Sequence, residues 1–248
     1  MTQFKDHFSR QSKLYSQYRP NYPDALFSFL ANLAPKNENA WDCATGNGQA
    51  AISLVPYFEK IIATDASENQ LAHAEKHPQI EYRVMSAEKT NLPDQCIDLI
   101  TVAQAIHWFN FPKFFREANR VLKPDGILAV WTYNLPRISA QADRLLLDFY
   151  TGEINKYWPA ERLHIEKDYQ DIPFPYKQLE VPEFKMETKW TVKEIVGFLY
   201  TWSAVNKFIE TTGNDPVSSF KTDFEKLFPD SKKKILISWP MTFLVGRK

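Results

Sequence analysis

The sequence of 248 residues has few cysteines and no excess of either charge. It contains only two cysteines, Cys43 and Cys96, and each lies in a short apolar run. Two thiols do not make the disulfide framework of a small secreted domain, so we expect a reduced, cytoplasmic protein. Basic and acidic residues number 30 each. This balance gives no electrostatic reason to expect a nucleic-acid partner.

Long apolar runs and clusters of metal ligands are also missing. No segment approaches the roughly 20 apolar residues that a membrane-spanning helix needs, and the first residues do not begin a signal peptide. No set of histidines, cysteines and carboxylates has the spacing of metal ligands. We therefore expect no membrane partner and no bound metal. The length suits one large domain, which we expect to be a monomer or a homodimer.

Glycine is scarce, with seven in the chain, yet two of them lie close together. The stretch "AWDCATGNGQAA" at residues 40–51 places Gly46 and Gly48 just after a short apolar run. A glycine pair that opens a helix lets backbone N–H groups approach a ligand closely. The spacing also satisfies the loose G-x-G-x-x-A form of the dinucleotide fingerprint. This loop is therefore a candidate site for a dinucleotide or another nucleoside cofactor.

Short apolar runs alternate with helical segments in the first half of the chain. Strands are predicted at 40–43, 60–64, 80–84, 97–102 and 127–133, and helices at 23–34, 48–57, 67–76 and within 104–122. This alternation indicates parallel strands joined by right-handed crossovers. The sequence thus predicts an α/β fold with a doubly wound, mostly parallel sheet.

The alternation of short apolar runs and helical segments ends after residue 134. Helices are predicted at 138–157, 192–208 and 215–228, a strand at 183–190, an irregular proline-rich stretch at 168–182, and a closing strand at 241–245. We interpret 1–248 as a single domain. Its predicted parts are an N-terminal arm at 1–22, a cofactor-binding core at 36–134, a helical cap for the substrate at 138–228, and a closing strand region at 235–248.

Informative residues follow the ends of the predicted strands, where open α/β sheets bind ligands. Asp42 precedes the glycine loop, and Asp65 ends the second strand, where a carboxylate can accept both ribose hydroxyl hydrogens. The run 86–88, Ser-Ala-Glu, follows the third strand. The fourth strand is followed by Gln104 and His107.

The residues at these strand ends fit a cofactor with one nucleoside and an amino-acid tail better than they fit NAD. With NAD, Asp42 has no role, and a nicotinamide enzyme is expected to have a second half for the other nucleotide. With one nucleoside and an amino-acid tail, Asp42 faces the amino group, Asp65 holds the ribose, and Ser86 and Ala87 lie beside the adenine. A nicotinamide-dependent oxidoreductase and a non-catalytic cofactor-binding protein of the same fold remain alternatives.

Four successive segments carry a family resemblance: "WDCATGNGQAAISL", "ATDASENQLAHA", "SAEKTNLPDQCIDLITVAQAIHWFN" and "EANRVLKPDGILAVW". They resemble the ordered motifs of class I S-adenosylmethionine-dependent methyltransferases. The run "QAIHWF" and the earlier "YSQYRPNYP" are similar to a small-molecule branch that includes trans-aconitate methyltransferase-like proteins. The resemblance implies a seven-stranded Rossmann-like sheet with a cap inserted near the C-terminus. It also implies S-adenosylmethionine as methyl donor, S-adenosylhomocysteine as product, and a small acceptor with a carboxylate, hydroxyl or amine.

The resemblance also implies roles for individual residues. The expected cofactor-binding residues are Tyr18, Arg19, Asp42, Ala44, Gly46, Gly48, Asp65, Ala66, Ser86, Ala87, Glu88 and Gln104. The arm at 1–22 is expected to fold over the cofactor. His107 is the candidate base for a hydroxyl or amine acceptor, whereas a carboxylate acceptor needs none. On the cap, Trp190, Trp202 and Ser203 are expected either to line the substrate site or to pack.

Two positions depart from the family pattern. Ala44 stands where the family usually has its first glycine, and alanine is tolerable there only if the residue keeps a negative φ. Ser86 stands where an aspartate commonly contacts the adenine amino group. A serine can still form that contact, so we expect a weaker adenine contact and no loss of binding.

Overall fold

The computed structural model describes residues 18–248, and its centre is a seven-stranded sheet in the order β3-β2-β1-β4-β5-β9-β6. The strands are β1 (Asn39–Cys43), β2 (Lys60–Asp65), β3 (Ile80–Val84), β4 (Ile97–Ala103), β5 (Leu122–Tyr133), β6 (Lys177–Gln178) and β9 (Met241–Arg247). Strands β1 to β5 are parallel to their neighbours, whereas β9 is antiparallel to β5 and β6. The predicted doubly wound, mostly parallel sheet is confirmed.

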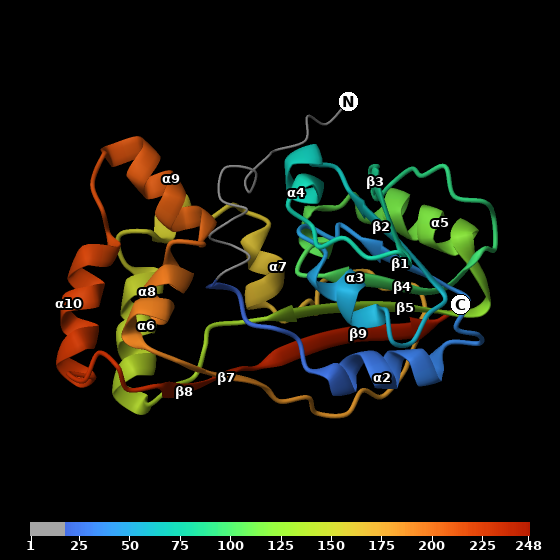
Figure 1. Cartoon of the computed structure of the whole chain (residues 1–248). Helices are drawn as coiled ribbons and strands as arrows, with labels where there is room; N and C mark the ends of the chain where they lie inside the picture. The colour runs from blue at the N-terminus through green and yellow to red at the C-terminus, as the bar shows by residue number, and fades with distance from the viewer. Residues whose placement is uncertain (1–17) are drawn as a thin grey trace.

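Helices cover both faces of this sheet (Figure 1). They are α2 (Asp24–Leu33), α3 (Gln49–Leu54), α4 (Glu68–Ala72) and α5 (Phe111–Val121), with a 3₁₀ helix η2 (Ile106–Trp108). Buried residues of α2 and α3 share one core with Ala40 and Ile61, whereas those of α5 share another with Trp41 and Ile62. Because adjacent residues of one strand point to opposite faces, both faces need apolar side chains, which explains the continuous apolar runs.

A second group of elements forms the cap, and it lies beside the sheet with α7 (Arg162–Glu166) between the two (Figure 1). The cap consists of α6 (Ala140–Thr151), η3 (Asn155–Tyr157), β7 (Met186–Trp190), α8 (Val192–Leu199), α9 (Ser203–Thr212), α10 (Val217–Leu227) and β8 (Ile235–Trp239). Its aromatic-rich interior is a third core. Strands β7 and β8 pair antiparallel as a separate two-stranded sheet.

The connection that follows β5 and the connection that precedes β9 are hydrogen-bonded to each other. The backbone N–H of Arg137 donates to the carbonyl of Ser238 (2.7 Å), and that of Ser238 donates to Arg137 (3.0 Å). The N–H of Asn134 donates to the carbonyl of Pro240 (3.3 Å). We call these paired connections the neck. The neck joins the cap to the middle of the sheet.

The structure differs from the predicted elements mainly within the cap. The helix expected over 192–208 is two helices, α8 and α9, because the chain is extended at Trp202 (ψ 131°). The hydroxyl of Thr201 donates to the carbonyl of Phe198 (2.6 Å), and such a bond competes with helix continuation. Helix α7 and strands β6 and β8 were not predicted. The predicted boundaries of arm, core and cap stay predictions, and residues 1–17 of the arm lie outside the described residues.

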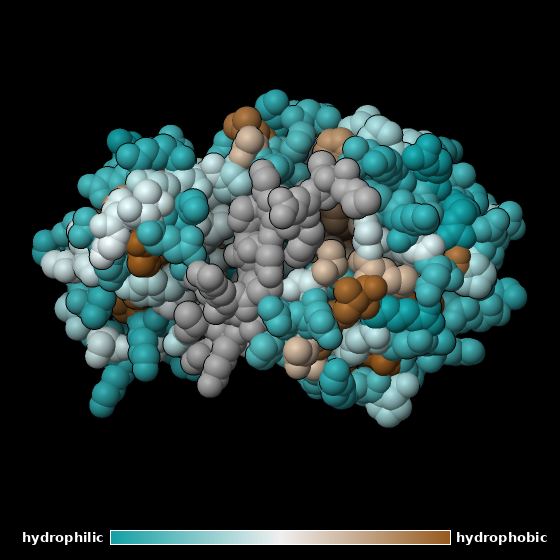
Figure 2. Space-filling model, turned by 90° about the horizontal axis from the view of Figure 1, so that it is seen from above, coloured by the Kyte–Doolittle hydropathy of each residue, from teal (hydrophilic) through white to brown (hydrophobic). Residues whose placement is uncertain are grey.

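The surface of the described residues is largely polar. The large apolar side chains that are exposed come from separate elements: Val84, Leu147, Leu163, Leu227 and Leu236. In the view from above, apolar residues form small separate groups on a hydrophilic surface (Figure 2). Within residues 18–248, no helix combines the length and apolarity needed to cross a bilayer.

Candidate active site

The glycine loop joins β1 to α3 in a sequence of left-handed backbone conformations. Ala44, Gly46 and Gly48 have φ values of +56°, +57° and +85°, and the N–H of Thr45 donates to Thr64 of β2 (2.9 Å). The expectation of a negative φ at Ala44 is therefore wrong. The sharp reversal between strand and helix imposes the left-handed conformation, which costs an L-residue roughly 1–2 kcal/mol.

Asp65 ends β2 and holds the glycine loop in place. Its Oδ2 accepts the N–H of Gly46 (2.9 Å), and its Oδ1 accepts the N–H of Ser67 (2.9 Å). Ser67 is the N-cap of α4, as its own hydroxyl accepts from Gln70. Asp65 is half-buried and lies directly beside the glycine loop.

Asp42 lies in β1 and is fully buried. It accepts hydrogen bonds from the hydroxyls of Thr45 in the loop (2.5 Å) and Thr101 in β4 (2.8 Å). Burial raises the pKa of this carboxyl to about 6, although the two hydroxyls oppose the increase. Parallel pairing of β1 with β2 and β4 places Asp42, Asp65 and the loop at the same edge of the sheet. The predicted contact of Asp42 with an amino group stays a prediction.

The residues after β3 form a turn at the same edge. The hydroxyl of Ser86 donates to the carboxylate of Glu88, and the N–H of Glu88 donates back to the hydroxyl of Ser86 (3.2 Å). A second oxygen of Glu88 accepts the N–H of Asn110 (3.1 Å). Ser86 and Ala66 are exposed, and Ala87 is half-buried. Their predicted contacts with adenine and ribose stay predictions.

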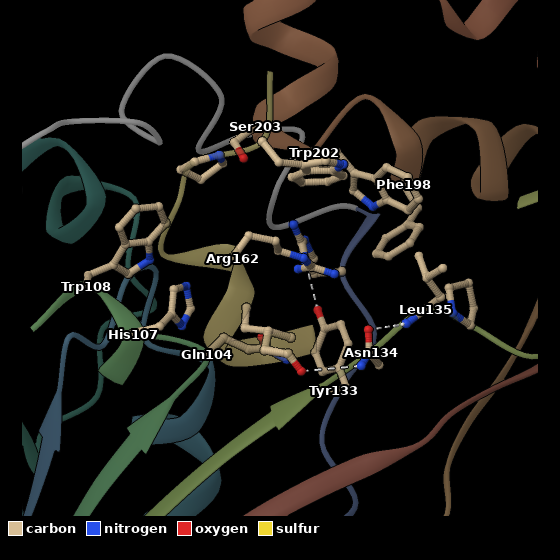
Figure 3. A pocket seen from close by; sticks show the side chains of 15 residues that line it. Gln104, His107, Trp108, Tyr133, Asn134, Leu135, Arg162, Phe198, Trp202 and Ser203 are labelled. Carbon is tan, nitrogen blue, oxygen red and sulfur yellow. Dashed lines mark hydrogen bonds between the residues drawn. The ribbon is translucent and has the colours of Figure 1, made fainter. Parts of the chain in front are cut away.

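A cavity of about 70 Å³ lies between the carboxyl ends of β4 and β5 and the cap (Figure 3). The sheet side contributes Gln104, His107, Trp108, Tyr133 and Asn134, and the cap side contributes Trp158, Phe198, Trp202 and Ser203. Trp202 and Ser203 therefore line the cavity. Trp190 belongs to the apolar core of the cap, where its ring packs against Phe198 and Trp239.

Arg19 connects the two walls of this cavity. Its Nη1 donates to the hydroxyl of Tyr133 on β5 (2.9 Å), and its Nη2 donates to the carbonyl of Thr201 in the cap (3.4 Å). Its guanidinium carbon lies 5.3 Å from the ring centre of Phe198. The preceding Tyr18 packs closely on Gly197 of α8, where a β-carbon would come within 2.7 Å of the ring.

Arg162 of α7 enters the cavity from the other side, and no sequence motif indicated it. Its Nε donates to the hydroxyl of Tyr150 (2.9 Å), which donates to Glu166 (2.5 Å). The guanidinium carbon lies 5.4 Å from the ring centre of Tyr150 and 4.9 Å from that of Trp158. Within residues 18–248, no hydrogen bond engages its two terminal nitrogens. Figure 3 shows the side chain of Arg162 pointing into the cavity.

His107 lies in η2 at the floor of the cavity, with 6 % of its surface exposed. Burial lowers its pKa to about 3, and the positive charges of Arg162 and His164 contribute. Its Nδ1 lies 3.0 Å from the hydroxyl of Tyr169. The ring is therefore neutral at pH 7, and it is a weaker base than the sequence led us to expect.

Comparisons with known proteins bear on this arrangement. A family model described as "Methyltransferase domain" matches residues 41–130. A Dictyostelium discoideum protein named "putative methyltransferase" is 33% identical over 254 residues, which span 100% of this chain and 97% of that protein. A solved structure from Anaeromyxobacter dehalogenans, named "putative type II methyltransferase", has a TM-score of 0.86 and 36% identity, and covers 93% of this chain and 98% of that chain.

A third relative matches only part of the chain. It is a Saccharomyces cerevisiae protein named "probable S-adenosylmethionine-dependent methyltransferase", 28% identical over 135 residues. The match covers 51% of this chain and 46% of that protein. The similarity to the first two proteins therefore extends over sheet and cap, whereas the third shares about half of the chain.

Proposed function

Because the chain belongs to the class I S-adenosylmethionine-dependent methyltransferases, we propose that it methylates a small molecule bound in the cavity between sheet and cap. S-adenosylmethionine supplies an electrophilic methyl group when it is bound. The chain's own contribution is to bind both reactants, to align them and to keep water out. The sequence has a net charge of +0, so we propose that the acceptor is a small molecule and not a nucleic acid. We also propose that the protein is cytoplasmic and is a monomer or a homodimer.

The residues at the edge of the sheet fit such a methyl donor. Gly48 is packed against the ring of Tyr82, but among the described residues a β-carbon on Gly46 would meet nothing closer than Gln70 Oε1 at 3.9 Å, which leaves room beside Gly46. A carboxylate at the position of Asp65 suits the hydroxyls of a ribose, and the carboxylate of Asp42 suits an amino group. We propose that the loop, Asp42 and Asp65 hold the donor, with Ser86 to Glu88 near the adenine and with Tyr18, Arg19 and Gln104 on the cavity side.

The charge of the cavity carries the proposal for the acceptor. Arg19 and Arg162 line it, whereas none of its lining residues is an aspartate or glutamate, and His107 is neutral. Two cations without a carboxylate favour an acceptor with an anionic group, either carboxylate or phosphate, which a guanidinium can bind with two parallel hydrogen bonds. The indole and phenyl rings of the walls suit an apolar body. A cationic amine is disfavoured.

Methyl transfer from labelled S-adenosylmethionine to a panel of metabolites tests the function, and calorimetry with S-adenosylhomocysteine tests the donor site. We expect acceptors with an anionic group to be methylated and their neutral amides to be inactive. Arg162→Gln should raise the KM of an active acceptor by about tenfold or more, because a charge-assisted hydrogen bond contributes about 1.5–3 kcal/mol. Its affinity for S-adenosylhomocysteine should stay unchanged.

Arg144→Gln is the matched control, because Arg144 is an exposed arginine of α6 that pairs with Asp148 on the same helix. It should behave as the wild type in both assays. A chain that binds S-adenosylhomocysteine but methylates neutral and anionic acceptors equally would contradict the acceptor proposal. A chain that neither binds S-adenosylhomocysteine nor transfers methyl groups would contradict the function itself.

A further inference from the structure

Residues 18–22 contact the cap, the cavity and the sheet in succession, and we call them the strap. Tyr18 packs on α8 of the cap, and Arg19 joins the two walls of the cavity. At the other end of the strap, the ring of Tyr22 packs edge-on against Trp131 of β5, with the ring centres 5.4 Å apart. In Figure 1 the strap is the blue segment that runs from the cap side of the molecule to α2.

Gln49 ties the middle of the strap to the glycine loop. Its Nε2 donates to the carbonyl of Pro20 (2.8 Å) and to Oδ1 of Asn21 (3.0 Å). Gln49 is the first residue of α3, and Gly48 is the N-cap of that helix. One side-chain amide therefore joins the strap to the loop that we propose as the donor site.

The strap is stiff between its contact with Gln49 and its contact with the cavity. The ring of Pro20 fixes φ at about −65°, and a residue that precedes a proline is confined to extended conformations. Arg19 therefore has little backbone freedom relative to Pro20, which is itself buried. A shift of the Pro20 carbonyl at Gln49 is for this reason passed on to Arg19.

We infer that Gln49 is a positioning residue through which occupation of the donor site orders the acceptor cavity. The inference rests on the proposed function. When a donor is bound, the glycine loop and the first turn of α3 lose freedom, and the hydrogen bonds of Gln49 extend this restriction to the strap. Arg19 then holds the sheet and the cap at a fixed spacing. The donor should accordingly bind before the acceptor, and by linkage each reactant should strengthen the binding of the other.

Gln49→Glu tests the inference with little change of shape. The amide nitrogen of Gln49 has two hydrogens, and the two hydrogen bonds to the strap use both. A carboxylate at this position has no hydrogen to donate and would place an oxygen against the carbonyl of Pro20. Gln141→Glu is the matched control, because Gln141 is an exposed glutamine in the first turn of α6.

Hydrogen–deuterium exchange of the full chain, with and without saturating S-adenosylhomocysteine, measures the effect. In the wild type, S-adenosylhomocysteine should slow exchange at 44–50 and also at 198–203, which contributes the cap wall of the cavity. We expect the slowing at 198–203 to be about twofold to tenfold, which corresponds to the contribution of one hydrogen bond. In Gln49→Glu it should disappear, whereas 44–50 should still be protected. Gln141→Glu should behave as the wild type.

The difference that S-adenosylhomocysteine makes is the decisive quantity. A purely structural role of Gln49 would change exchange at 198–203 equally with and without S-adenosylhomocysteine. Wild-type protection confined to 44–50 would overturn the inference. Protection at 198–203 that persists in Gln49→Glu would overturn it as well, because the cap would then respond without the strap.

Asn21→Ala provides a second variant in case Gln49→Glu does not fold. It removes one of the two hydrogen bonds of Gln49 and keeps the carbonyl of Pro20. The protection at 198–203 should therefore be reduced, and an unchanged value would contradict the inference. Calorimetry identifies a failure of the proposed function separately, since S-adenosylhomocysteine would then not bind the wild type at all.

Discussion

Replacing Asp42 by asparagine should stabilise the fold in a pH-dependent way. The carboxyl is fully buried, and its pKa is raised from 3.8 to about 6. The native state therefore binds this proton more tightly than the unfolded chain does, so stability falls as the pH rises from about 4 to 6. The interval from 3.8 to about 6 corresponds to about 3 kcal/mol, at 1.36 kcal/mol per pH unit. Asparagine carries no charge at any pH and avoids this loss.

Denaturant unfolding of wild type and Asp42→Asn over a pH series measures the effect. The variant should gain about 3 kcal/mol at pH 7, which corresponds to a Tm increase of roughly 6–12 °C for a chain of this size. Below pH 4 the two proteins should be equally stable. If Asp42 also contacts the donor's amino group, the variant should lose affinity for S-adenosylhomocysteine. Stability would then rise as function falls.

Asp98→Asn is the control for this experiment. Asp98 is also fully buried, but it lies 2.9 Å from the ammonium of Lys123 and accepts the N–H of Asn39. Asp98→Asn removes a carboxylate that pairs with Lys123. The free energy of unfolding of this variant should therefore be lower than that of the wild type across the pH series. Parallel pH dependences for wild type and Asp42→Asn, or a variant that is less stable at pH 8, would refute the argument for Asp42.

Three further predictions concern the glycine loop and Asp65, which contacts it. Ala44→Gly should raise the free energy of unfolding by about 1 kcal/mol in denaturant titrations, because glycine adopts the left-handed conformation without strain; a loss of stability would contradict the observed φ. Gly48→Ala should destabilise the fold, since its β-carbon would collide with the hydroxyl of Tyr82, and Tyr82→Phe should restore part of the Tm; no effect of either change would disprove this contact. Asp65→Ala should weaken S-adenosylhomocysteine binding by about tenfold or more in calorimetry, whereas unchanged affinity in a folded variant would remove Asp65 from the site.

The parallel half of the fold could be predicted from the sequence because its signals are local. Buried strands such as β2 and β4 are apolar runs, and the crossovers after β1, β2 and β4 contain helices with recognisable ends. The cap was harder to predict, since β7 and β8 pair residues as distant as Met186 and Trp239. Neither strand has a strong pattern without its partner. The break between α8 and α9 was missed as well, at a position where Trp202 is buried in the cap.

The residues of the site also fall into two groups: those that a local sequence motif predicts, and those that only tertiary packing brings together. The loop and Asp65 belong to a motif that the sequence displays. Arg162 lies in a short helix without any motif, and only the packing of α7 on the sheet brings it to the cavity. Tyr169 lies in a stretch predicted to be irregular, and its contact with His107 requires a left-handed φ that tertiary structure imposes. The same cause explains the wrong expectation for Ala44.

The position of β9 has a consequence for how the chain folds. β9 pairs with β5 from Ile127–Arg247 to Tyr133–Met241, so the entire cap is an excursion between two adjacent strands. Closing so long a loop is slow, and pairings distant in sequence form late. Until they form, β5 is an open strand edge that another chain could pair with. Cap variants with normal stability should therefore still aggregate during refolding if they slow the collapse that brings β9 to β5.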